Sequence, residues 1–150
     1  MKQIKKILYA TDLTERSEPA FEQAEMLAKL AGAELHILHV VAEMADARRG
    51  MLQPETFEIM EKEVETLALK EMDNFCKKRL KGNNCTTEVV IGLPYEQIIK
   101  RAREIKADLI VVGTHGQTAL EHMLVGSTAE RVVRRSEIPV LTVRDCRPTR

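Results

Sequence analysis

Apolar residues gather in five short runs along the chain, and segments with helical spacing separate these runs. The runs lie at 4–10, 33–42, 85–92, 107–113 and 138–144. Runs of this length that end at polar or turn-forming residues are typical of β-strands. The run 107–113 contains "LIVV" with no polar alternation, so we expect a strand that is buried on both faces of its sheet.

Four segments between these runs carry the signals of helices. The first begins at Ser17-Glu18-Pro19, a capping residue with proline in the first turn, and stops at Gly32. The others are expected from Pro54 to about Leu80, from Pro94 onward, and from about Ser127 to Ser136. The long second helix carries an apolar stripe that we expect to be buried in the core. Its members are Phe57, Met60, Val64, Leu67, Ala68, Met72, Phe75, Cys76 and Leu80.

Strands that alternate with helices predict an α/β fold with a doubly wound, five-stranded parallel sheet and helices on both faces. The 150 residues point to one domain, followed by a flexible tail at 145–150. Two strand orders are compatible with the pattern. We prefer 3-2-1-4-5 over 2-1-3-4-5, because it brings the polar turn after the first strand beside the glycine-rich turn after the fourth.

The charge balance restricts the class of partner. Lys and Arg total 23 and Asp and Glu total 23, so the net charge is zero. A non-specific nucleic-acid binder needs a basic face, and a membrane-surface binder a polybasic one, so we expect neither partner. No apolar run has the length of a signal peptide or a transmembrane helix. The three cysteines follow no metal or disulfide spacing, and free thiols in the cytoplasm are expected.

The stretch "GTHGQTALEHMLVGST" at 113–128 places Gly113, Gly116 and Gly126 between the fourth strand and the fourth helix. Glycines let a ligand approach the backbone closely, and a helix start offers unpaired N–H donors to an anion. A purely structural interpretation stays open, because Ser127 and Glu130 match a capping box. The stretch is not a phosphate-binding loop of the GxxxxGK[ST] type, since Ser127 follows Gly126 directly.

The spacing of these glycines, G-x2-G-x9-G-[ST], resembles that of the ATP-binding branch of the universal stress protein family. The segments "ILYATDLTERSEPAF", "ELHILHVV" and "LVGSTAERVVRRSEIPVLTVR" resemble the same family in the same order, and the resemblance covers about residues 1–144. It implies a nucleotide-binding domain over 1–144, bound ATP with Mg²⁺ bridging the phosphates, and a homodimer joined through the last strand, 138–144.

The resemblance also implies individual contacts. Asp12 matches the acidic residue that contacts the nucleoside, and Val40 matches the residue whose backbone reads the adenine edge. The remaining expected contacts line the nucleoside or the phosphates: Ala10, Thr11, Val112, Gly113, Gly116, Gly126, Ser127 and Thr128. Gln117 stands where family members often carry Arg or Lys, and the loss of a cation near the phosphates should weaken binding without abolishing it.

Three functions remain possible from the sequence. They are a nucleotide-holding regulator of a stress response, a slow ATPase or phosphotransfer enzyme, and an interaction module without a ligand. The glycine motif argues against the third. The lack of Lys or Arg in the motif argues against the second, because phosphoryl transfer needs cations for the developing charge.

The loop at 43–53 is expected beside the adenine end, as a lid or a plain connector. His36 and His39 point to opposite faces of their strand and cannot share a metal.

Overall fold

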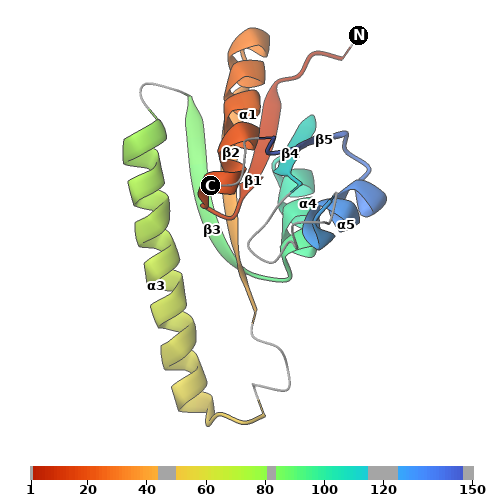
Figure 1. Ribbon diagram of the computed structural model, residues 1–150. Helices are drawn as coiled ribbons and strands as arrows, with labels where there is room; N and C mark the ends of the chain where they lie inside the picture. Colours follow the sequence, from red (N-terminus) through yellow and green to blue (C-terminus); the bar gives the residue numbers. More distant parts are fainter. Residues whose placement is uncertain (1, 44–49, 81–83, 115–124, 147–150) are drawn as a thin grey trace.

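A computed structural model describes residues 2–43, 50–80, 84–114 and 125–146 of the chain. Five parallel strands form one sheet in the order β3-β2-β1-β4-β5, which confirms the predicted fold class and strand order (Figure 1). The strands are β1 (Lys6–Thr11), β2 (Glu34–Ala42), β3 (Cys85–Gly92), β4 (Leu109–Gly113) and β5 (Val140–Val143). The helices are η1 (Glu15–Ser17), α1 (Glu18–Ala31), α3 (Pro54–Arg79), α4 (Pro94–Glu104) and α5 (Ser127–Arg135).

The central strand β1 pairs with β2 on one side and with β4 on the other. Ala10, the next-to-last residue of β1, is in register with Leu38 and Val112, so the three strands reach the same edge of the sheet together. The side chains of Ile7, Leu8 and Tyr9 are fully buried, since helices cover both faces of this strand. No helix in the described segments is long and apolar enough to cross a membrane.

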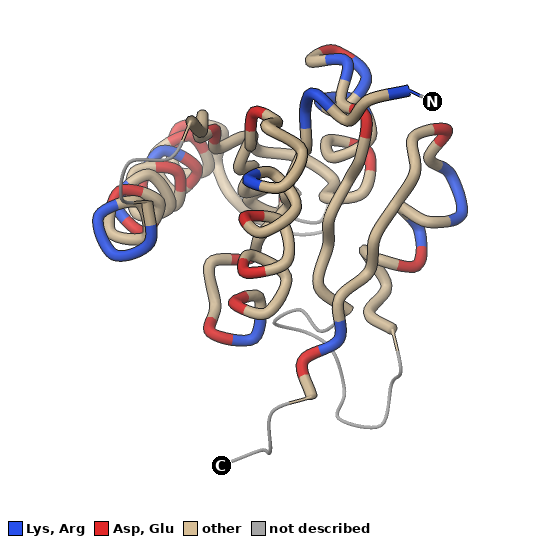
Figure 2. Tube along the Cα trace, turned by 90° about the horizontal axis from the view of Figure 1, so that it is seen from above, with Lys and Arg blue, Asp and Glu red and all other residues tan. Residues whose placement is uncertain are grey.

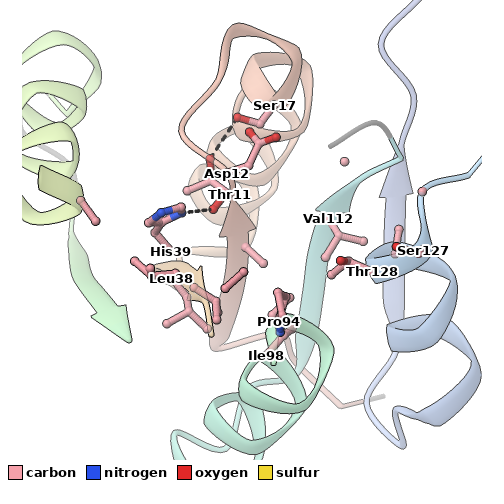
Figure 3. A pocket seen from close by; sticks show the side chains of 18 of the residues that line it. Thr11, Asp12, Ser17, Leu38, His39, Pro94, Ile98, Val112, Ser127 and Thr128 are labelled. Carbon is pink, nitrogen blue, oxygen red and sulfur yellow. Dashed lines mark hydrogen bonds between the residues drawn. The ribbon is translucent and has the colours of Figure 1, made fainter. Parts of the chain in front are cut away.

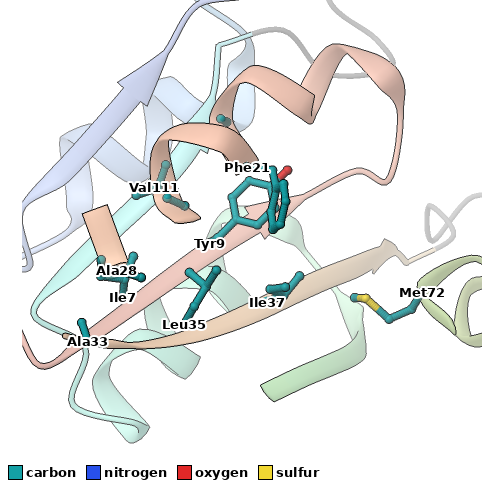
Figure 4. Close-up of a cluster of buried hydrophobic side chains, with 11 residues drawn as sticks. Ile7, Tyr9, Phe21, Ala28, Ala33, Leu35, Ile37, Met72 and Val111 are labelled. Atoms are coloured by element: carbon teal, nitrogen blue, oxygen red, sulfur yellow. The ribbon is translucent and has the colours of Figure 1, made fainter. Parts of the chain in front are cut away.

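Two helices pack on each face of the sheet. On one face, α1 and the C-terminal part of α3 enclose a cluster that includes Tyr9, Leu35 and Met72 (Figure 4). On the other face, α4 and α5 cover Leu8 and Leu38. The period-2 alternation of each strand sends successive side chains to these two clusters, which is why the runs are apolar throughout.

An aromatic contact series anchors α1 to the sheet. The rings of Tyr9 and Phe21 have centroids 5.8 Å apart, and Phe21 meets Phe75 of α3 edge-on at 5.2 Å. The Tyr9 hydroxyl donates a hydrogen bond to the carbonyl oxygen of Ser17 at 2.9 Å. Desolvation by burial is the main cause that raises the pKa of Tyr9 to about 12. The start of α1 is therefore attached to β1 by packing and by a buried hydrogen bond.

The helix boundaries largely follow the sequence signals. Pro19 lies in the first turn of α1, and Gly32 ends this helix with a left-handed φ of 63°. Ser17 occupies the predicted cap position, but its side chain does not cap the helix. Its hydroxyl donates instead to the carbonyl oxygen of Thr14 at 2.8 Å, because the short η1 turn brings that oxygen within reach.

The apolar stripe of α3 is only partly buried, so the expectation of a core stripe is wrong for its N-terminal half. Ala68 and Met72 are buried, whereas Met60, Val64 and Leu67 are exposed to 38%, 47% and 58%. The reason is length. At about 1.5 Å per residue, 26 helical residues extend roughly 39 Å, while the eight residues of β3 extend about 26 Å. The helix thus continues past the carboxyl edge of the sheet (Figure 1).

Candidate functional site

A cavity of about 540 Å³ opens at the carboxyl ends of β1, β2 and β4, beside the start of α5. Its position follows from the topology. The chain leaves β1 toward β2 in one direction and reaches β4 on the other side, so the loops diverge and leave a crevice. The residues that line it are Ala10, Thr11, Asp12, Ser17, Leu38, His39, Val40, Val41, Ala42, Val64, Leu67, Ala68, Glu71, Pro94, Ile98, Val112, Gly113, Thr114, Gly126, Ser127, Thr128 and Ala129.

The residues expected at a binding site meet in this cavity. Those that line it are Ala10, Thr11, Asp12, Val40, Val112, Gly113, Gly126, Ser127 and Thr128 (Figure 3). Gly116, the remaining expected contact, lies outside the described residues, and so does Gln117. Residues 44–49 of the expected lid or connector are also outside them. The structure therefore brings together segments that are more than a hundred positions apart in the sequence.

The turn after β1 holds Asp12 in a defined orientation. One carboxylate oxygen, Oδ1, accepts hydrogen bonds from the Thr14 amide at 2.9 Å and from the Thr14 hydroxyl at 2.6 Å. The amide of Leu13, which has a φ of 63°, donates to Thr11 Oγ1 at 2.9 Å. A non-glycine residue in this left-handed region is uncommon, and the surrounding bonds hold it there.

The second carboxylate oxygen of Asp12 is different. Oδ2 is buried and has no hydrogen-bond partner in the described structure. A buried acceptor without a donor is costly, and a native protein seldom tolerates one without a reason. Because Asp12 lines the cavity, a ligand hydroxyl could donate to this oxygen. This unsatisfied acceptor marks Asp12 as a candidate ligand contact.

Two further hydrogen bonds connect this turn to its neighbours. The hydroxyl oxygens of Thr11 and Ser17 lie 3.0 Å apart, which joins the end of β1 to the start of α1. His39 Nδ1 lies 2.8 Å from the carbonyl oxygen of Thr11. A carbonyl oxygen only accepts, so Nδ1 must carry the proton. Sequence reasoning considered His39 only as a metal ligand and missed this contact, which depends on the strand pairing.

The start of α5 differs from the expected capping box. Gly126, not Ser127, is the N-cap residue, and no side chain caps the helix. The Gly126 amide donates to the Thr114 carbonyl at 2.5 Å, and the Glu130 carboxylate pairs with Arg134 instead of returning to the cap. With glycine at the cap position there is no side-chain oxygen to satisfy the first turn. Its N–H groups and partial positive charge face the cavity beside Ser127 and Thr128.

Several lining residues were missed by the sequence analysis as site residues. Leu38, Pro94 and Ile98 form an apolar wall on the α4 side, and Val64 and Leu67 contribute from the exposed part of α3. Apolar side chains in strands and helices carry no chemical signature, so no sequence signal distinguished them from core. Together they give the cavity an apolar side.

The histidines and acids in the described segments form no cluster of three or more that could hold a metal ion. His36 Nε2 lies 3.0 Å from Glu88 Oε2, and the same oxygen accepts from Arg101 of α4 at 2.7 Å. His39 points to the other face, toward the Thr11 carbonyl.

Comparison with known proteins identifies the chain. The sequence profile of the universal stress protein family matches residues 3–144. The chain belongs to this family. Universal stress protein MJ0577 of Methanocaldococcus jannaschii is 33% identical over 154 residues, which cover 93% of this chain and 94% of that protein. Universal stress protein YxiE of Bacillus subtilis is 37% identical over 145 residues, which cover 93% of this chain and 98% of that protein.

Solved structures of universal stress proteins have the same fold. The structure of MJ0577 superposes with a TM-score of 0.85 at 31% identity and covers 98% of this chain and 100% of that one. A universal stress protein in complex with cAMP gives a TM-score of 0.62 at 25% identity, with 95% of this chain and 98% of that one covered. An adenine nucleotide is therefore a ligand of at least one protein of this fold and family.

Proposed function

We propose that this universal stress protein binds ATP in the cavity at the carboxyl edge and acts as a nucleotide-holding regulator of a stress response in the cytoplasm. The observation that carries the proposal is the buried, unpartnered Oδ2 of Asp12 in a cavity shared with the uncapped start of α5. One feature needs a hydroxyl donor and the other attracts an anion. A ribose phosphate offers both groups in one molecule.

The described residues suggest how each part of ATP would be held. The ribose hydroxyls would donate to Asp12 Oδ2, and the adenine would lie against the apolar wall near Val40 and Ile98. The phosphates would accept hydrogen bonds from the first turn of α5 and from the Ser127 and Thr128 hydroxyls. Mg²⁺, a hard cation that prefers oxygen ligands, would be held chiefly by the phosphate oxygens.

The same lining argues for binding without efficient hydrolysis. None of the described residues that line the cavity is a lysine or an arginine. Transfer of a phosphoryl group needs cations for the developing charge and a group that positions water. Binding that holds ATP and its transition state equally well does not raise turnover. The regulator is thus favoured over the slow ATPase, and the polar cavity favours it over a ligand-free module.

The proposal extends to a homodimer joined through β5. Only β4 pairs with β5 among the described strands, so the outer edge of β5 is open to another chain. Its residues Val140, Leu141 and Val143 are partly buried and apolar. An apolar strand edge invites pairing with a second strand, and a two-fold axis would satisfy both edges at once.

The test starts from the purified protein. Denaturation and chromatography should release an adenine nucleotide that copurified, or titration calorimetry should detect ATP binding. The variant Asp12→Ala should lose at least about tenfold in affinity, equal to about 1.4 kcal/mol. Asp73→Ala removes an exposed carboxylate that pairs with Lys77 on α3, outside the cavity, and serves as the matched control.

Phosphate release from ATP with Mg²⁺ separates the regulator from the enzyme. We expect turnover far below the ~1–100 s⁻¹ of working kinases. Turnover near that range that Asp12→Ala or Ser127→Ala abolishes would establish the enzyme instead. No ATP affinity in the unmodified protein, or equal affinity in Asp12→Ala, would refute the assignment of the cavity.

A further inference from the structure

A second hollow lies between α4 and α5, on the outer surface of that helix layer. This hollow, the α4–α5 groove, has a volume of about 460 Å³ and is lined by Tyr95, Glu96, Ile99, Lys100, Arg103, Glu104 and Arg135. None of these residues lines the cavity at the carboxyl edge. The α4–α5 groove is therefore a separate site from the proposed nucleotide contacts, although α4 and α5 contribute residues to both.

Tyr95 organises the groove. Only 9% of this residue is exposed, and its hydroxyl donates to Glu96 at 3.0 Å while it accepts from Arg135 at 2.8 Å. The guanidinium carbons of Arg131 and Arg135 lie 5.3 and 4.8 Å from the centre of the Tyr95 ring. Both distances are within the range of a cation–π contact. One buried ring therefore keeps two arginine heads together in a fixed arrangement.

Two guanidinium groups over one ring repel each other, and the ring compensates this repulsion only in part. The positive charges of nearby arginines are neutralised by carboxylates. Arg101 pairs with Glu88 and Glu104, and Arg134 pairs with Glu130. Arg131 and Arg135, by contrast, have no ion pair within the described ranges. The ring of Tyr95 positions both guanidinium groups, but no carboxylate of the described residues neutralises their charges.

The basic surface extends along α4. Lys100 is exposed and has no carboxylate partner among the described residues. Arg103 lies 3.9 Å from Glu137, and both side chains are more than half exposed, so this pair neutralises little charge. Three cations, Lys100, Arg103 and Arg135, therefore line the groove, and Arg131 lies over the ring of Tyr95 beside them. The two carboxylates of the groove, Glu96 and Glu104, already accept from Tyr95 and Arg101. The excess is positive.

We propose that the α4–α5 groove is a docking site for an acidic segment of a partner protein. Planar guanidinium groups bind carboxylates with two parallel hydrogen bonds, and arginine and tyrosine are enriched at the centres of protein interfaces. Glu96 and Glu104 flank the cations, so a continuous row of phosphates would meet two carboxylates. The carboxylates of a peptide stand on flexible side chains that can turn away from these two, which favours protein over nucleic acid.

The test uses the full chain and a fluorescein-labelled oligoglutamate as probe. Fluorescence anisotropy should show binding that weakens as salt is added, because the contact is between charges near the surface. The triple variant Lys100→Gln, Arg131→Gln and Arg135→Gln should bind at least about tenfold more weakly. The matched control, Lys62→Gln, Lys70→Gln and Lys78→Gln, removes the same charge from exposed positions of α3 and should retain the affinity.

Three results would overturn the proposal. They are absence of binding, an equal loss in both triple variants, and tighter binding of a single-stranded RNA with the same charge as the oligoglutamate. Circular dichroism on each variant detects any loss of fold. The single variant Lys100→Gln leaves the contacts of Tyr95 intact and should still lower the affinity by about threefold, which separates charge from packing.

Discussion

His39 Nδ1 lies 2.8 Å from the carbonyl oxygen of Thr11 and joins β2 to the last residue of β1, just before the turn that carries Asp12 (Figure 3). The side chain thus reaches across two paired strands at the point where β1 ends in the cavity. The turn contains a left-handed Leu13, and the bond from His39 is one of the contacts that hold it. His39 is therefore a positioning residue for Asp12 in the proposed site.

His39→Phe should weaken ATP binding while the fold is retained. The ring volume stays, but the donor to Thr11 is lost, and a net hydrogen bond contributes about 1 kcal/mol. We expect a loss of about threefold to tenfold in affinity by titration calorimetry. His36→Phe, which removes the contact to Glu88 on the α4 face, is the control and should leave ATP affinity unchanged. Equal effects of the two variants would show that His39 has no particular role.

Gly126→Val should abolish binding at the start of α5. The added side chain would stand at the N-cap, where a phosphate is proposed to approach the backbone. Gly126 has a φ of −66°, which valine can adopt, so the fold should persist in circular dichroism. Calorimetry should show an affinity loss of at least about tenfold. Unchanged affinity would contradict the proposed contact between a phosphate and Gly126.

Leu141→Lys should favour the monomer. Leu141 is partly buried in β5, and a charge there would have to be desolvated when two β5 edges pair. Light scattering at micromolar concentration should give about twice the 17.0 kDa chain mass for the unmodified protein and a lower mass for the variant. Leu30→Lys, at a position of α1 that is 78% exposed, is a control for the added charge alone. A monomeric unmodified protein would contradict the proposed homodimer.

Tyr9 should make the stability fall at alkaline pH. Burial raises its pKa from 10.0 to about 12, so the folded state holds the phenol proton more tightly than the unfolded state. The contribution of protonated Tyr9 to the free energy of unfolding is fully present below pH 10, and it is lost as the pH rises toward 12. Tyr9→Phe lacks the bond to Ser17 and should be less stable at neutral pH, but its stability should decline less over this range.

Urea unfolding at a series of pH values measures both effects. Tyr95→Phe is the matched control, because its ring lies on the opposite side of the sheet, in the cluster under α4 and α5. It should keep the alkaline decline of the unmodified protein. If Tyr9→Phe showed the same decline as the unmodified protein, ionisation of Tyr9 would not be its cause.

Charge on the described surface is mixed, as the interspersed colours along the helices of Figure 2 show. The balanced composition already indicated this, because 23 basic and 23 acidic residues cannot give one sign to the whole surface. The composition does not show where one sign of charge is locally in excess. The α4–α5 groove depends on which arginines find a carboxylate, and that depends on how two helices pack. No count of residues could have located it.

The sequence by itself determined the alternation of strands and helices, and it favoured the observed strand order and the region of the candidate site. Apolar runs, prolines and glycines act locally, and the topological rule for parallel sheets converts them into a place for the crevice. The segment around Asp12 and the turn before Ser127 were therefore predictable, and the structure brings them together at one cavity. The resemblance to a family supplied the expectation that the ligand is ATP.

Only the tertiary structure decided which polar atoms are satisfied and how far each apolar stripe is covered. Asp12 Oδ2 lacks a partner because the turn directs Oδ1, and not Oδ2, toward Thr14. Gly126 is the N-cap of α5, and its amide donates to the carbonyl of Thr114, which directly follows β4. Val64 and Leu67 are exposed because α3 is longer than the sheet beneath it. The contact of Gly126 with Thr114 and the exposure of Val64 and Leu67 depend on how separate elements pack, which a local pattern does not contain.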